Sequence, residues 1–96
     1  TKEVTLILLR EGKTPMEIAI ERKMTQSTIE GHLAYFIAKQ EINANQIIST
    51  KKLAEIVATI VKLKTIKMNE IREHLGRAYS FGEIKIAIAA YLAEGN

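Results

Sequence analysis

The sequence of 96 residues contains no cysteine, no tryptophan and no aspartate, and its single proline is Pro15. Without cysteine, the chain forms no disulfide and offers no thiolate to a metal. The same lack is compatible with an intracellular protein, and we expect a cytoplasmic location. No apolar run approaches the ~20 residues of a membrane-spanning helix, and no signal peptide is recognisable. We therefore expect no membrane partner.

Aromatic residues are also few, since three tyrosines and two phenylalanines stand among many isoleucines, leucines and alanines. A chain of this length is expected to form one domain with one modest core. The acidic residues are all glutamate, which favours helix more than aspartate does. The sequence therefore predicts an all-α fold, a small multi-helix domain over residues 1–96. Because the chain begins with Thr1, we expect a domain excised from a longer protein.

Residues 14–37 predict two helices joined by a tight turn. Thr14, Pro15 and Glu17 have the spacing of a capping box with proline at the first helical position. Thr25 is the expected cap of the second helix. The inner face of that helix should carry the apolar residues that recur at helical spacing: Ile29, Leu33, Phe36 and Ile37. This pattern is typical of a helix-turn-helix.

Further helices are predicted on both sides of this unit. Residues 2–11 should form a helix that Gly12 ends, and residues 51–64 should form another. The segments 67–75 and 81–93 resemble the first pair of helices, with a capping box at Ser80 and Glu83. They allow a second helix-turn-helix in tandem, although any two short helical hairpins look alike. In the last helix we expect these residues to point inward: Phe81, Ile84, Ile88, Tyr91 and Leu92.

The sequence offers little for catalysis. His32 and His74 are the only histidines, and neither has the further ligands that a metal site needs. His32 is expected to be a half-buried, hydrogen-bonded histidine. There is no GxxxxGK[ST] loop, and without aspartate an ATPase is excluded. We expect no catalytic residue, no metal and no cofactor in this domain.

Positive charge is unevenly distributed along the chain. Residues 1–50 carry six basic and six acidic residues, whereas residues 51–96 carry eight basic and five acidic ones. The net charge of +3 therefore lies in the second half. The candidates for phosphate contacts there are Lys62, Lys64, Lys67, Arg72 and Arg77. For any one of them, an ordinary solvated lysine or arginine is the alternative.

The second helix of a helix-turn-helix normally enters the major groove with its N-terminal part. Gln26, Ser27 and Thr28 are the candidates for base or phosphate contacts at this place. We expect Glu30, Gly31 and Ala34 to face outward as well. Glu30 would repel phosphate, and the other two side chains donate no hydrogen bond. The sequence therefore argues against sequence-specific readout by this helix.

The segment 5–33, TLILLREGKTPMEIAIERKMTQSTIEGHL, resembles the C-terminal helix-turn-helix domain of RecQ-like ATP-dependent DNA helicases of the Bacteroidetes type. The residues that carry the resemblance are Thr5, Leu6, 9–12, 17–19, Arg22 and 27–33, with Glu70, Ile71, Ser80, Glu83 and Ile84 in the second half. The resemblance implies an accessory module, remote from the motor, that places the enzyme on DNA or on a partner. DNA and the other domains of the parent helicase are its implied partners.

Two hypotheses for the function remain open at this point. One is an accessory nucleic-acid-binding domain with weak, electrostatic and largely sequence-independent binding. The other is a protein-docking module without direct DNA contact. The second would be favoured by apolar side chains that point outward, for which the candidates are Leu6, Leu8, Tyr35 and Ile86.

Overall fold

The computed structural model describes residues 1–95 and confirms the all-α fold, with no strand among these residues. None of the helices in this part of the chain is long and apolar enough to cross a membrane. The elements, in chain order, are α1 (Lys2–Arg10), α2 (Pro15–Arg22), α3 (Gln26–Ala38), a short 3₁₀ turn η1 (Ala44–Gln46), α4 (Thr50–Leu63), α5 (Met68–Leu75) and α6 (Phe81–Glu94).

Local signals at the helix ends behave as the sequence predicts. The backbone N–H of Thr14 donates to Glu17 Oε1 at 2.8 Å, and the N–H of Glu17 donates to Thr14 Oγ1 at 3.2 Å. The same reciprocal pair joins Ser80 and Glu83 at 3.0 and 3.1 Å. Gly12, just after α1, has φ +97°, a conformation that glycine adopts without strain. Both predicted capping boxes and the glycine end of α1 are confirmed.

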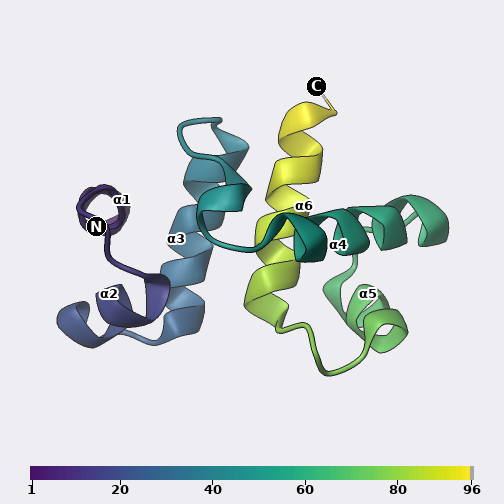
Figure 1. Ribbon diagram of the computed structural model, residues 1–96, viewed down its shortest axis with the longest axis horizontal. Coiled ribbons are helices and arrows are strands. Elements are labelled where there is room, and N and C mark those ends of the chain that lie inside the picture. Colours follow the sequence, from purple (N-terminus) through teal and green to yellow (C-terminus); the bar gives the residue numbers. More distant parts are fainter. Residues whose placement is uncertain (96) are drawn as a thin grey trace.

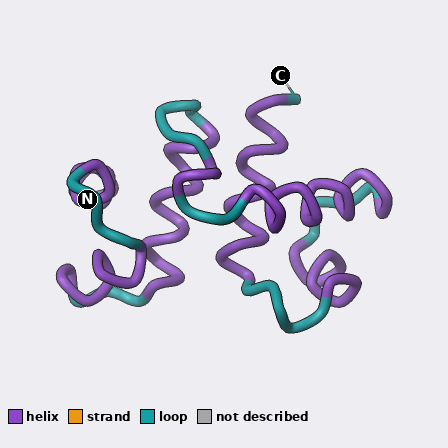
Figure 2. Tube along the Cα trace, in the orientation of Figure 1, coloured by secondary structure: helices purple, strands orange, loops and turns teal. Residues whose placement is uncertain are grey.

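Helices α3 and α6 form the centre of the molecule and lie side by side (Figure 1). They run in the same direction: Gly82 in the first turn of α6 meets Glu30 of α3, and Gln40 beyond α3 donates to the carbonyl of Ala93 at 2.9 Å. Helices α1 and α2 pack against α3, and α4 and α5 pack against α6 (Figure 2). Two three-helix groups therefore meet along their third helices.

The core is aliphatic, as the composition predicts. Its fully buried side chains come from every α-helix, and the largest of them are Ile18, Ile29, Leu33, Ile56, Ile71, Ile84, Ile86 and Thr5. Ile29, Leu33, Phe36 and Ile37 of α3 are all buried, which confirms the predicted inner face.

Several predicted orientations are wrong. Leu6, Leu8 and Ile86 are buried rather than outward, and of the four apolar candidates only Tyr35 is exposed. Phe81 and Leu92, expected inside, are exposed instead. The physical reason is that α1 packs against both α2 and α3, and α6 against α3, α4 and α5, so the buried surface of neither helix follows a single helical stripe.

A second pair of helices repeats the order of the first. Helices α2 and α3 are joined by residues 23–25, and α5 and α6 by residues 76–80. Thr25 and Ser80 cap the third helix of each group through the N–H of the third residue beyond them. When the two segments are aligned at these caps, Ile29 and Ile84 occupy the same position, four residues after the cap. Both side chains are completely buried. The pair α5–α6 therefore repeats the pair α2–α3, as the possible second helix-turn-helix predicted.

Candidate nucleic-acid interface

The first turn of α3 carries three sequence-predicted residues, Gln26, Ser27 and Thr28, and all three are exposed. Two of them are engaged locally. The Gln26 amide donates to Glu30 Oε2 at 3.4 Å, and the Thr28 hydroxyl shares a 2.9 Å hydrogen bond with the hydroxyl of Thr25. Thr28 therefore supports the cap of α3, and Ser27 is the residue of the three that remains best placed to meet a ligand.

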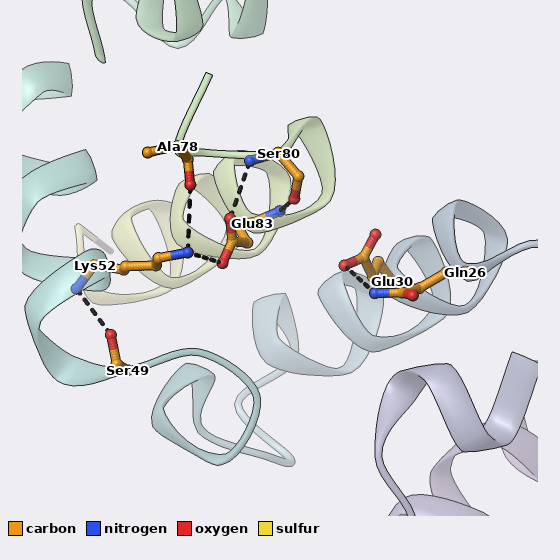
Figure 3. A network of polar contacts seen from close by, with 7 residues as sticks. All are labelled: Gln26, Glu30, Ser49, Lys52, Ala78, Ser80 and Glu83. Carbon is orange, nitrogen blue, oxygen red and sulfur yellow. Dashed lines mark hydrogen bonds and ion pairs between the residues drawn. The ribbon is translucent and has the colours of Figure 1, made fainter. Parts of the chain in front are cut away.

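The rest of the expected DNA-facing surface of α3 is covered. Glu30 is only 8% exposed, and its side chain points from α3 toward the first turn of α6 (Figure 3). A Cβ atom at Gly82 would collide with the Glu30 carboxylate, so this carboxylate lies directly against the first turn of α6. Ala34 is also buried. The prediction that Glu30, Gly31 and Ala34 face outward is wrong for Glu30 and Ala34, because α6 occupies that side.

The environment of Glu30 disfavours its charged form. Burial raises the pKa of this carboxyl above its ordinary value, and the nearby Glu83 carboxylate raises it further. The Gln26 amide and Lys85 act in the opposite direction but do not outweigh burial. Gly31 lies beside the same contact: a Cβ there would be 3.8 Å from Lys85 Nζ.

A second group of predicted residues lies at the bend between α4 and α5, which we call the α4–α5 corner: Lys62, Lys64 and Lys67. All three are exposed. Lys62 is in the last turn of α4, Lys64 follows in the left-handed conformation with φ +55°, and Lys67 directly precedes α5. Lys67 faces Glu70 at 3.9 Å, whereas within residues 1–95 the structure pairs neither Lys62 nor Lys64 with a carboxylate.

The third group, Arg72 and Arg77, lines a shallow depression between α5 and the start of α6. The guanidinium carbon of Arg72 lies 4.5 Å from the centroid of the Phe81 ring, over its face. Phe81 remains 42% exposed, and Arg77 is exposed beside the same depression. The sequence predicts that Phe81 points inward. The spacing of apolar residues along α6 gives no sign that its first residue instead lies at the surface, with Arg72 over its ring.

The first turn of α3 and the α4–α5 corner do not form one surface. The first turn of α3 lies next to α2 on one side of the molecule, whereas the end of α4 lies on the opposite side (Figure 1). The α4–α5 corner and the Arg72–Arg77 depression both belong to the α4–α6 half. The structure therefore separates Gln26, Ser27 and Thr28 from the lysines of the α4–α5 corner.

Another lysine of the second half, Lys52, has a structural role. Its Nζ lies 2.8 Å from Glu83 Oε2 and donates to the carbonyl of Ala78 at 3.4 Å, which ties α4 to the start of α6 (Figure 3). Burial alone would raise the pKa of Glu83, but hydrogen bonds from Lys52 and Ser80 outweigh it and hold that pKa below its ordinary value. Lys52 is therefore paired with Glu83, whereas Lys62 and Lys64 of the α4–α5 corner have no such carboxylate partner within residues 1–95.

His32 belongs to the framework. Arg22 donates to Thr5 Oγ1 at 2.6 Å, and Thr5 Oγ1 lies 2.9 Å from His32 Nδ1. The Thr5 hydroxyl therefore links Arg22 to the imidazole of His32. Burial and the charge of Arg22 lower the pKa of His32. The half-buried, hydrogen-bonded histidine is confirmed, and within residues 1–95 no three metal-ligating side chains come together.

Comparison with known protein families matches residues 1–88 to a family described as a helix-turn-helix domain. The chain belongs to this family. A helix-turn-helix domain suggests nucleic-acid binding in general, in agreement with the α2–α3 geometry. No curated protein and no solved structure matches the chain significantly.

Proposed function

We propose that this helix-turn-helix domain binds nucleic acid weakly and without strong sequence preference, through the basic residues of its α4–α6 half. The observation that carries the proposal is the burial of Glu30 against Gly82. Because α6 covers the side of α3 that carries Glu30, this side cannot enter a major groove. The exposed lysines of the α4–α5 corner are better suited to phosphate contacts, which carry no sequence information.

We further propose that the domain is a non-catalytic accessory module of a RecQ-like DNA helicase, in the cytoplasm. What supports this part is the resemblance of residues 5–33 and of the later Glu70, Ile71 and Ser80 to that family. In such a protein, a weak electrostatic contact would add to the affinity of the motor through effective concentration. DNA and the remaining helicase domains are the proposed partners.

A protein-docking module is the second candidate, and exposed apolar side chains on the other half favour it. Ile7 of α1 and Met16 and Ile20 of α2 are each more than half exposed, at 56%, 59% and 73%. Side chains of this kind can contact a partner protein. In this alternative, α1 and α2 provide the contact and the basic corner is only solvated surface.

A salt titration separates the two candidates. Fluorescence polarisation should be measured with duplex, forked and single-stranded DNA of two unrelated sequences at several salt concentrations. We expect the logarithm of the association constant to fall linearly with the logarithm of the salt concentration. The slope should be about −2.7 for three duplex phosphate contacts at about 0.9 each. The two sequences should bind alike. No binding at the lowest salt would favour the docking module, and a strong sequence preference would return the contact to α3.

A further inference from the structure

The depression between α5 and α6 combines features that a phosphate contact alone does not require. It is lined by Asn69, Arg72, Glu73, Gly76, Arg77 and Phe81. The Phe81 ring is 42% exposed, although large aromatic side chains are usually buried. We propose that this depression holds an unpaired nucleobase, so that the domain prefers single-stranded or frayed nucleic acid to an intact duplex. The inference rests on the proposed nucleic-acid binding and specifies its ligand.

Arg72 and Phe81 form a surface on which an unpaired base can stack. Arg72 covers one face of the Phe81 ring, with its guanidinium carbon 4.5 Å from the ring centroid. A planar guanidinium and an aromatic ring are the two kinds of surface on which proteins stack unpaired bases. The Arg72–Phe81 pair therefore presents a stacking surface that is already assembled. A base inside a duplex cannot reach it, because both of its faces are covered by neighbouring bases.

Side chains of both charges, Arg77 and Glu73, line the depression. Arg77 is exposed at the same place, and a strand whose base enters the depression would carry its phosphates past this side chain. Glu73 also lines the depression, and its carboxylate would repel a phosphate inside it. The same carboxylate can accept from the exocyclic amine of a base, such as cytosine N4. The mixed charge thus favours a base inside the depression and the backbone at its margin.

The absence of tryptophan gives a direct test. A Phe81→Trp variant would have a single tryptophan, placed in the depression, whose fluorescence should be quenched when single-stranded DNA stacks on it. The matched control is Ile20→Trp, on the exposed side of α2 in the other half. We expect quenching by oligo-dC in Phe81→Trp and none in Ile20→Trp. Saturating oligo-dC that leaves Phe81→Trp unquenched would overturn the stacking site.

Affinities provide the second readout. Phe81→Ala should weaken binding to single-stranded DNA by about 5- to 150-fold, the loss typical of one base–aromatic stack, and should leave duplex binding nearly unchanged. Phe81→Tyr keeps the ring and should retain wild-type affinity for both DNAs. Thermal melts of each variant confirm that the domain remains folded. Equal losses for single-stranded and duplex DNA, or a Phe81→Tyr variant as weak as Phe81→Ala, would contradict the site.

The outcomes also separate this inference from the proposed function. If the wild-type protein binds no DNA at low salt, nucleic-acid binding fails and the base site fails with it. If the wild type binds both DNAs with a steep salt dependence but Phe81→Ala does not change their ratio, the proposed function stands and the base site is wrong.

Discussion

Helices α1–α3 and helices α4–α6 follow the same order, yet they present different surfaces to a ligand. With the caps Thr25 and Ser80 superposed in sequence, Gln26 corresponds to Phe81, and Glu30 corresponds to Lys85. The first half is neutral in charge, whereas the second carries the whole surplus of positive charge. In this molecule the helix-turn-helix geometry sets the packing of both halves, and side-chain charge is what distinguishes their surfaces.

The largest effect should come from the matched core positions. Ile29→Ala and Ile84→Ala should each lower the free energy of unfolding by about 2–5 kcal/mol, because both side chains are completely buried. Urea denaturation measures both values, and the corresponding Ile→Val changes, at about 0.5–1.5 kcal/mol each, serve if an alanine variant does not fold. A large loss at one position and almost none at the other would show that the two halves are not packed alike.

The next effect tests the contact between the halves. Gly82→Ala should destabilise the domain, because its Cβ would collide with the buried Glu30 carboxylate. In a Glu30→Ala background the space is free, and the same change should cost little. We expect a coupling energy of about 0.5–3 kcal/mol from the four urea denaturation curves.

Gly31→Ala is the matched control in the other helix. Its Cβ would meet only Lys85 Nζ, at an ordinary 3.8 Å, so this change should be neutral or stabilising. Additive effects of Gly82→Ala and Glu30→Ala would argue that α6 does not cover α3 as described.

Much of the fold was predictable from the sequence because its signals are local. The Thr14–Glu17 and Ser80–Glu83 boxes and the end of α1 at Gly12 each depend on a few neighbouring residues. The burial of Glu30 and Ile86 was not predictable, since it depends on the packing of α3 against α6, more than fifty residues later in the chain. For the same reason, sequence reasoning found Arg72 and Arg77 as isolated cations but not the contact between Arg72 and Phe81.

The caps of the two third helices should have smaller and comparable effects. Thr25→Ala and Ser80→Ala should each lower stability by about 1 kcal/mol, because each side chain accepts from a backbone N–H that would otherwise lack a helical partner. Ser80→Ala should cost slightly more, since Glu83 completes a reciprocal box only there. Thermal melts would detect both changes. No loss in either variant would contradict the cap assignments.

The smallest effect concerns pH. The folded-state pKa of Glu30 is raised, so the folded protein binds more protons than the unfolded one between the unfolded-state value near 4.5 and the raised value. Glu30 therefore contributes a loss of stability as pH rises through this interval. Glu30→Gln should have a higher Tm than wild type near neutral pH and the same Tm below pH 4.5. A difference in Tm that does not change with pH would contradict this assignment.

The most direct measurement compares charge reversal in the two halves. One triple variant changes Lys62, Lys64 and Lys67 to Glu. Its matched control changes three exposed lysines of the first half to Glu: Lys2, Lys23 and Lys39. The net charge changes equally, and each triple includes one lysine in the left-handed conformation, Lys64 or Lys23. DNA affinity is then measured against salt concentration for both variants and for the wild type.

We expect reversal at the α4–α5 corner to remove most of the affinity and to flatten the slope of log affinity against log salt by about 0.9 for each lost duplex phosphate contact. The control should keep the wild-type slope, with a modest loss of affinity from its lower net charge. Binding that survives reversal at the α4–α5 corner but is lost in the control would contradict binding through the α4–α6 half. It would place the DNA on the first helix-turn-helix, where Lys23 lies in the turn before α3.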